Sequence, residues 1–220
     1  MKRVLLALVC AALVGTSAFA QKFSLGAHAS AGQWLYLPEE MDIGFHVWPA
    51  IDLAVELDKV DVLFEIDFGI TKMSELQSTT ITLPIIGSFP VQWVEDYTFW
   101  ILGFKGGVAP KLKASDKVTF SFPIWLKFIH IGYKADIPSL FNIGEAKNGG
   151  RNVFGIDLGA RAYYAATEKV AGFIGFQVPL FAAASQMKGD LYGGGTFKNK
   201  DSQFHMLNSG AIDLGVKFTF

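Results

Sequence analysis

The chain ends on the stretch Ala211-Ile212-Asp213-Leu214-Gly215-Val216-Lys217-Phe218-Thr219-Phe220, and the alternation in this stretch decides the fold. Apolar side chains stand at every second position, namely Ile212, Leu214, Val216, Phe218 and Phe220. Because successive side chains of a β-strand point to opposite faces, this period of two predicts a strand with one apolar and one polar face. A strand of a soluble protein shows the same period, so the rest of the chain must indicate what the apolar face contacts.

The composition favours strands that cross a membrane. Hydrophobic residues make up 51% of the 220 residues, while Asp, Glu, Lys and Arg still make up 18%. Beyond the N-terminus the sequence contains no apolar run of the roughly 18 residues that a membrane-spanning helix needs. The hydrophobic residues are instead interleaved with glycine, charged and hydroxyl-bearing residues, which is typical of a membrane β-barrel.

The N-terminus predicts export. A basic pair precedes an apolar segment, residues 4–14, and Ala18-Phe19-Ala20 then supplies the small residues that precede a cleavage site. We predict that residues 1–20 are a cleaved signal peptide and that residues 21–220 form one barrel domain. Cleavage would remove the only cysteine, Cys10, and two of the 19 basic residues, which leaves 17 against 20 acids and a formal charge of −3. This balance gives no indication of nucleic-acid binding.

The predicted mature chain contains eight alternating segments, which we interpret as eight strands. They cover about residues 22–34, 43–56, 62–71, 97–112, 118–128, 154–164, 170–181 and 211–220. Short connections (57–61, 113–117 and 166–169) alternate strictly with longer ones (about 35–42, 72–95, 134–152 and 182–208). Short turns at one end and long loops at the other predict an all-β fold, a closed antiparallel up-and-down transmembrane β-barrel. The alternative is a barrel of ten strands, in which residues 79–95 form an additional membrane hairpin that turns at Gly87-Ser88.

Four prolines interrupt the predicted strands. They are Pro49, Pro110, Pro123 and Pro179. Because proline has no N–H to donate to a strand ladder, we expect some of them to mark strand ends or bulges.

The signal peptide, the eight strands, the alternating loop lengths and the terminal Phe resemble the small bacterial outer-membrane β-barrels of the OmpA, OmpX and OmpW type. The resemblance covers the mature chain in pattern and rests on no diagnostic motif beyond the last strand. It implies a location in the bacterial outer membrane, contact with outer-membrane lipid, and insertion by the barrel-assembly machinery through the last strand. Phe218 and Phe220 would then form the C-terminal insertion signal.

The polar face of the predicted strands points into the barrel and carries charges of both signs. By the period of two, the ion-pair candidates inside are Asp52, Glu56, Glu65, Asp67, Lys105, Lys127, Asp157, Arg161, Asp213 and Lys217. The interior of an eight-stranded barrel is narrow enough for side chains to fill it. We therefore expect these charges to pair across the lumen and plug it, and the alternative is a narrow polar path.

The loop 72–95 is too apolar for an ordinary surface connection. Its apolar residues include Ile81, Leu83, Ile85, Ile86, Phe89 and Val91. An exposed patch of this kind predicts contact with an extracellular partner or gating of a hydrophobic ligand. The alternative is that the two flanking strands simply extend above the membrane.

The sequence predicts no catalytic, cofactor-binding or metal site. The four histidines, His28, His46, His130 and His205, are scattered, and the mature chain is predicted to contain no cysteine. We expect a non-enzymatic barrel that serves envelope integrity or surface interaction. The alternatives are a narrow, porin-like conduit for small or hydrophobic solutes, as the resemblance to OmpW implies, and a lipid-modifying enzyme.

Overall fold

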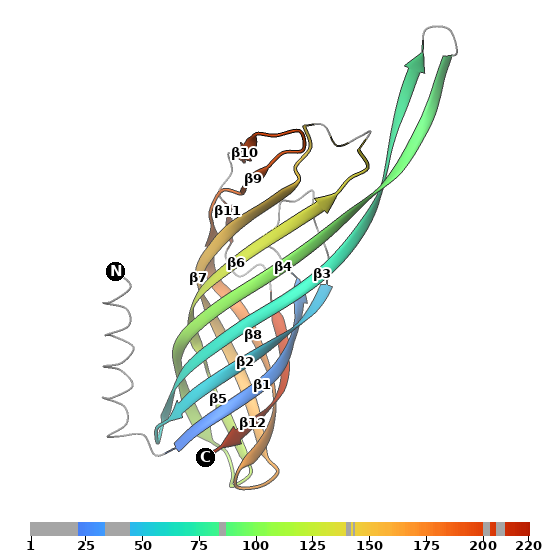
Figure 1. Cartoon of the computed structure of the whole chain (residues 1–220). Coiled ribbons are helices and arrows are strands. Elements are labelled where there is room, and N and C mark those ends of the chain that lie inside the picture. Colours follow the sequence, from blue (N-terminus) through green and yellow to red (C-terminus); the bar gives the residue numbers. More distant parts are fainter. Residues whose placement is uncertain are drawn as a thin grey trace.

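Eight antiparallel strands close into a barrel in the computed structural model (Figure 1). The structure describes residues 22–33, 45–83, 87–139, 142, 144–199, 203–205 and 210–220. Closure is direct, because the first strand pairs with the last over the register from Ser24↔Thr219 to Gly32↔Ala211. The predicted fold class is confirmed, and the ten-stranded alternative is wrong.

The strands of the barrel follow one another around the ring. They are β1 (Lys22–Gln33), β2 (Phe45–Glu56), β3 (Val60–Leu83), β4 (Gly87–Lys113), β5 (Val118–Ser121) with β6 (Ile124–Asp136), β7 (Asn148–Ala165), β8 (Val170–Ala184) and β12 (Ala211–Thr219). Three short strands, β9 (Lys188–Asp190), β10 (Thr196–Lys198) and β11 (Gln203–His205), lie between β8 and β12 at the upper end in Figure 1. The short turns and the C-terminus lie at the opposite, lower end.

Proline explains two departures from regular strands. The predicted continuous strand 118–128 is divided into β5 and β6 at Phe122-Pro123, so these two strands together form one strand of the ring. The ladder between β7 and β8 shifts register next to Pro179, where Ile156 pairs with Phe181 and Asp157 pairs with Pro179. Both irregularities occur where a backbone N–H is missing, as a proline in a sheet requires.

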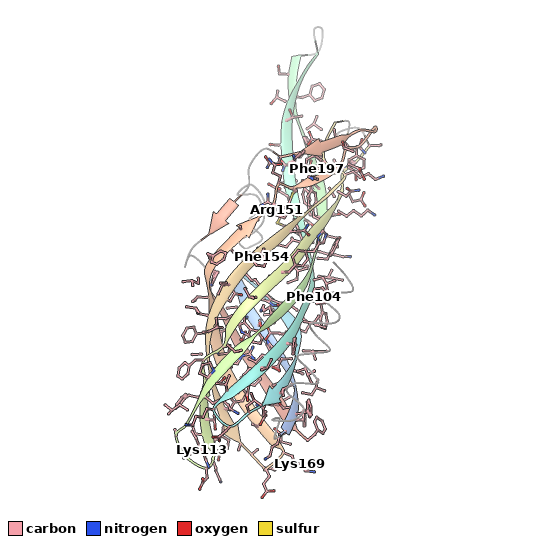
Figure 2. The ribbon with its side chains drawn as sticks, turned by 90° about the vertical axis from the view of Figure 1, so that its left-hand side faces the viewer. Phe104, Lys113, Arg151, Phe154, Lys169 and Phe197 are labelled. Atoms are coloured by element: carbon pink, nitrogen blue, oxygen red, sulfur yellow. The ribbon has the colours of Figure 1, made fainter. Side chains whose placement is uncertain are left out.

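The wall of the barrel separates an apolar outer face from a polar lumen. Exposed apolar side chains point outward from the barrel strands, including Leu25, Leu53, Phe68, Phe104, Phe128, Phe154, Phe176 and Leu214. In Figure 2 the labelled Lys113 and Lys169 lie at the lower end, and Arg151 and Phe197 lie toward the upper end. Among the described residues, no helix has the length and apolarity to cross a membrane. An outer face of this composition needs lipid or another apolar surface against it.

The hairpin of β3 and β4 continues far beyond the rest of the barrel (Figure 1). Its ladder runs without a break from Val60↔Pro110 to Leu83↔Gly87. The predicted loop 72–95 is therefore wrong over most of its length, whereas the interpretation that the two flanking strands simply extend agrees with this ladder. Gly87-Ser88 is not the turn, because both residues belong to β4. The predicted loop 134–152 is also too long, since β6 reaches Asp136 and β7 starts at Asn148. A ladder can continue outside lipid with the same alternation, so the sequence pattern does not mark where the membrane ends.

Candidate functional site

The middle of the lumen holds a network of buried ion pairs that joins strands from all sides of the ring. Lys105 Nζ lies 2.8 Å from Glu65 Oε1 and 2.9 Å from Asp67 Oδ2. Arg161 donates to Glu65 Oε2 at 2.7 Å, to Asp213 Oδ2 at 3.3 Å and to Asp52 Oδ2 at 3.4 Å. These side chains come from β2, β3, β4, β7 and β12, so the network ties non-adjacent strands together across the barrel.

Neutral groups complete this network. Asp213 Oδ1 accepts hydrogen bonds from Ser30 Oγ at 2.8 Å and from Gln177 Nε2 at 3.2 Å. Lys105 donates in turn to Gln177 Oε1 at 3.1 Å. The guanidinium of Arg161 also lies over the rings of Trp125 and Phe173, with 5.5 and 5.0 Å to the ring centroids. Hydrogen bonds and aromatic faces therefore replace much of the water that these charges lose on burial.

Two further ion-pair groups lie below and above the network. At the lower end, Lys217 lies 2.6 Å from Glu56 and 3.7 Å from Asp61, and Lys111 lies 2.7 Å from Asp61. Higher in the lumen, Lys127 pairs with Asp157 at 2.5 Å. The structure thus brings each of the ten predicted lumen residues into an ion pair with at least one other lumen residue.

The predicted set of lumen residues leaves out several polar side chains that the structure places there. Besides Ser30, they include His28, Asp61, Lys111 and Gln177. His28 and Gln177 stand on the polar face of alternating segments, so the period of two was the signal that could have identified them. Asp61 was assigned to a turn, because the predicted strand began one residue later than Asp61, whereas β3 begins before it. Lys111 lies close to the predicted strand end, where parity gives a weaker indication.

Next to the upper ion pairs, the lumen contains a small cavity of about 70 Å³. Its apolar wall includes Trp48, Ile101, Ile129, Ile131 and Val178, and its polar lining includes Asp67, Lys105, Lys127, Asp157 and Gln177. Buried apolar side chains such as Phe99 and Tyr133 pack above and beside this wall. The upper lumen is therefore apolar where the middle and the lower end are charged.

The β3–β4 hairpin is the other candidate for function. The pairing of β3 with β2 ends at Ala50↔Asp67, and the pairing of β4 with β6 ends at Asp96↔Asp136, so the hairpin beyond these points is a two-stranded ribbon. From Leu76 to Val94 its sequence contains no charged residue. Both of these side chains are exposed.

The predicted contact residues of this hairpin are described only in part. Phe89 is exposed and Val91 is half-buried. Ile81 and Leu83 belong to β3 by their backbone, and their side chains lie outside the described part of the structure, as do Ile85 and Ile86 entirely. The exposed Phe89 agrees with the prediction of an apolar surface, which otherwise stays a prediction.

A small polar cluster supports the base of the hairpin. Glu95 accepts hydrogen bonds from Trp93 Nε1 at 2.8 Å and from Tyr97 Oη at 2.5 Å. Burial raises the pKa of Tyr97 above its ordinary value, and the hydrogen bond to Glu95 raises it further. Tyr97 also stacks on Phe99, which lies inside the barrel. The base of the hairpin is therefore anchored to the upper lumen rather than free of it.

The two C-terminal aromatic residues lie on the outer face. Phe218 and Phe220 are both exposed, and Phe220 N donates to Phe23 O at 2.8 Å. This bond extends the closing ladder to the last residue of the chain. The position is compatible with the predicted insertion signal, which remains a prediction.

Comparison with solved structures supports the fold. The described chain is similar to a major outer membrane protein of Thermus thermophilus, with a TM-score of 0.51 and 12% identity over 90% of this chain and 99% of that chain. Neisserial surface protein A (TM-score 0.49, 12% identity, 90% and 97% coverage) and Ail of Yersinia pestis (TM-score 0.43, 11% identity, 90% and 97% coverage) are also similar. The predicted resemblance to small outer-membrane barrels is thereby confirmed as one of architecture, and the predicted outer-membrane location agrees with it. No protein-family model and no characterised protein sequence matches the chain.

Proposed function

We propose that this protein is a non-enzymatic barrel of the bacterial outer membrane, with a closed lumen, that holds the β3–β4 hairpin outside the cell as a surface for interaction. The hairpin carries this proposal. From Glu75↔Glu95 to Leu83↔Gly87 neither of its edges pairs with a neighbouring barrel strand in the described structure, and at 3.4 Å per residue this part is about 30 Å long. A two-stranded ribbon is only marginally stable in water by itself, so a rigid barrel beneath it has a clear mechanical role.

The chemistry of the hairpin supports an interaction with another macromolecule. It is uncharged over 19 residues, it exposes Leu76, Phe89 and Val94, and its edges offer unpaired backbone groups. Exposed strand edges are sites where an extended segment of another chain can add by β-strand pairing. Charged residues that would block such pairing are absent from this part of the sequence.

The ion pairs support a closed lumen and argue against catalysis. Each of the seven carboxylates of the three ion-pair groups lies within 4.0 Å of a Lys or Arg nitrogen. Passage of a solute would have to break several of these pairs. A carboxylate paired in this way is a poor general base, because protonation would break its ion pair with the Lys or Arg side chain.

A second function, binding of a small hydrophobic solute, is favoured by the cavity in the upper lumen. An apolar wall over a few polar groups is the usual composition of a small-molecule site, and the cavity volume of about 70 Å³ limits the solute to a very small one. In this reading the solute binds above the ion pairs and does not pass them. The role as a conduit would require these ion pairs to open.

The assembly of the protein forms part of the proposal. Residues 1–20, which lie outside the described part, would be removed as a signal peptide, and the last strand with Phe218 and Phe220 would be recognised by the barrel-assembly machinery. Outer-membrane lipid would then cover the apolar outer face. The pairing of β1 with β12 supports this order, since the ring closes only when the last strand is in place.

Labelling of single cysteines tests the orientation on which the proposed function depends. A Ser78→Cys variant should react with a membrane-impermeant maleimide on intact cells, because Ser78 is exposed on the hairpin. The matched control is Asp116→Cys in a short turn at the opposite end, which should react only after the outer membrane is permeabilised. The reverse pattern would refute the orientation.

Truncation of the hairpin tests the function itself. Replacing residues 75–95 by Asn-Gly joins Ser74 to Asp96, which are already paired, through a turn suited to a hairpin. Cells carrying the intact chain should adhere to immobilised host or bacterial surfaces, and cells carrying the truncated chain should not. Equal adhesion at equal surface amounts would contradict the proposal, as would ion conductance of the intact barrel in planar bilayers.

A further inference from the structure

The centre of the lumen holds more negative than positive charge. The connected network contains four carboxylates and two cationic side chains: Asp52, Glu65, Asp67 and Asp213 with Lys105 and Arg161. Among the described residues this network therefore lacks two positive charges, and all six side chains belong to residues that are at most 6% exposed. Because water does not screen buried charges well, such a deficit favours the uptake of positive charge.

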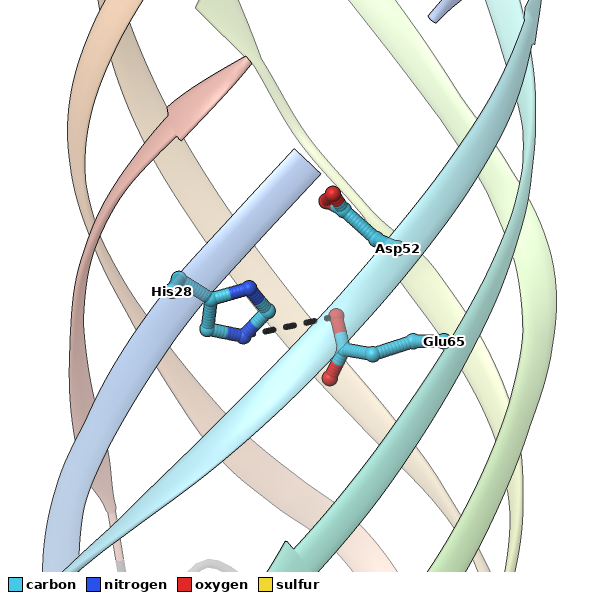
Figure 3. A group of neighbouring side chains, drawn as sticks. All are labelled: His28, Asp52 and Glu65. Atoms are coloured by element: carbon cyan, nitrogen blue, oxygen red, sulfur yellow. Dashed lines mark ion pairs between the residues drawn. The ribbon is translucent and has the colours of Figure 1, made fainter. Parts of the chain in front are cut away.

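His28 faces this network, and the dashed line in Figure 3 marks its ion pair with Glu65. Neither nitrogen of the imidazole makes a hydrogen bond to a described residue. Its side chain is fully buried, and Nε2 lies 3.7 Å from Glu65 Oε2, too far for a hydrogen bond. Buried polar atoms without hydrogen bonds are uncommon in native proteins and call for an explanation, of which a bound ion is one. The imidazole without hydrogen bonds is thus an observation independent of the charge deficit.

The three side chains drawn in Figure 3 converge on one point from neighbouring strands. One ligand atom each from His28, Asp52 and Glu65 lies within 4.8 Å of the other two. An imidazole nitrogen with two carboxylate oxygens is a donor set that divalent transition metals bind, whereas Mg²⁺ and Ca²⁺ prefer oxygen alone. With bonds of about 2.1 Å in a tetrahedral centre, ligand atoms lie about 3.4 Å apart, so the side chains need to approach by at most about 1.4 Å.

We propose that His28, Asp52 and Glu65 bind a divalent cation of the Zn²⁺ class in the lumen. A charge of +2 would neutralise the network of four carboxylates and two cations. It would also give one nitrogen of His28 a direct bond, in place of the hydrogen bond that neither nitrogen makes to a described residue. When a Glu65 oxygen binds the metal, Arg161 keeps its ion pair with Asp213, and Lys105 keeps its ion pair with Asp67.

The strand register leaves room for the Asp52 carboxylate at the proposed site. Gly26 of β1 is the residue opposite Asp52 of β2, and a Cβ at Gly26 would overlap the Asp52 carboxylate. The absence of a side chain there lets Asp52 lie over the backbone of β1, two residues from His28. Asp67 and Lys105 also line the cavity above, so the network adjoins space that an ion can occupy.

Metal binding to the folded, chelator-treated barrel in detergent tests the proposal. Titration with Co²⁺ should give visible d–d absorption bands at one equivalent, and Zn²⁺ should abolish them. His28→Gln should lose these bands, and Asp52→Asn, which keeps the size of the side chain, should weaken binding by at least about 100-fold. The matched control is His130→Gln, which should leave the titration unchanged, since the ring of His130 lies against Trp100 at the outer wall, with 4.8 Å between the ring centroids.

Two results would overturn the proposal. One is a wild-type barrel that binds no Co²⁺ or Zn²⁺ at a one-to-one ratio, or that binds as tightly after His28→Gln. The other is a barrel that gains thermal stability on acidification but not on addition of Zn²⁺, which would show that protons supply the missing charge. If His28→Gln does not fold, the thermal midpoints of wild type and Asp52→Asn are compared with and without Zn²⁺. Zn²⁺ should raise the midpoint of the wild type more than that of Asp52→Asn, and equal increases would overturn the proposal.

Discussion

Replacing Arg161 by Met should be among the most destabilising single changes in the lumen. Arg161 is the cation that three carboxylates share, at 2.7 Å to Glu65, 3.3 Å to Asp213 and 3.4 Å to Asp52. Methionine keeps an unbranched apolar side chain beside Trp125 and Phe173 but supplies no charge. Glu65 would retain Lys105, whereas Asp52 would lose the only cation within 4.0 Å that the described structure gives it.

The size of the effect follows from burial. Removing one partner of a buried ion pair costs about 3–5 kcal/mol, because the remaining charge is left without compensation. At 1.36 kcal/mol per factor of ten, this lowers the equilibrium constant for folding by roughly 160-fold to 4,700-fold. The pair Lys113–Asp116 is the matched control, because its side chains are 66% and 97% exposed at a similar distance of 2.8 Å. Exposed pairs contribute little, so Lys113→Met should leave stability unchanged within error.

Reversible urea unfolding in lipid vesicles, followed by tryptophan fluorescence, measures both variants. A second-site change, Asp52→Asn in the Arg161→Met background, should recover part of the loss, because it removes the carboxylate that was left alone. If Arg161→Met unfolds at the same urea concentration as Lys113→Met, the network is solvated and the reasoning from burial fails. If the second-site change makes the loss larger, Arg161 stabilises the barrel through packing rather than charge.

Three further predictions test the outer face, the hairpin and its base. Leu214→Arg on β12 should cost about 2–4 kcal/mol of folding free energy in vesicles, because Leu214 faces the middle of the bilayer. The control is Leu76→Arg on the hairpin, which should cost nothing measurable although Leu76 is as exposed as Leu214, at 65% and 66%. Equal costs would contradict the lipid-facing assignment. The truncation that replaces residues 75–95 by Asn-Gly should lower the thermal midpoint of the barrel, measured by circular dichroism, only slightly. The removed ribbon has no neighbouring strand at either edge in the described structure, although Tyr97 loses its hydrogen bond to Glu95. Because the folded pKa of Tyr97 is raised, its contribution to stability is complete below the ordinary tyrosine pKa of about 10 and is lost as the pH rises through the folded value. At pH 11 Tyr97 should therefore still be protonated, so the wild type and Tyr97→Phe should give the same tyrosinate signal in ultraviolet difference spectra. A wild-type signal larger by one tyrosinate would refute the assignment.

The sequence predicted which side chains point inward but not which of them meet. The period of two suffices for Asp52, Glu65, Arg161 and Asp213, because a strand has only two faces. Their contacts depend on the stagger of the strands around the ring, which no single strand encodes. The link from Arg161 on β7 to Asp52 on β2 is a contact of this kind. The same limit explains why His28 reads as one of four scattered histidines in the sequence, although its neighbours lie on the two strands that follow.

The length of the hairpin could not be predicted for a different reason. Alternation in Glu75, Gln77 and Trp93 continues the pattern of the barrel, since a strand in water obeys the same geometry as a strand in lipid. The change of environment is visible only in the outward residues, which pass from Ile70 and Trp100 to Lys72 and Thr98. A search for the position where the outward set loses its apolar character would have located the rim of the barrel, and with it the start of the ribbon.

The charged lumen is best understood as a device that selects one register. Lipid gives no preference among staggers of the strands, because every outward face is equally apolar. A shift of one residue in β7 would turn Arg161 toward lipid and leave three carboxylates without their cation. A shift of two would keep the faces but move the guanidinium along the strand by about 7 Å, out of reach of Glu65. Because these pairs cross the lumen from β7 to β2, β3 and β12, only the observed closure satisfies all of them.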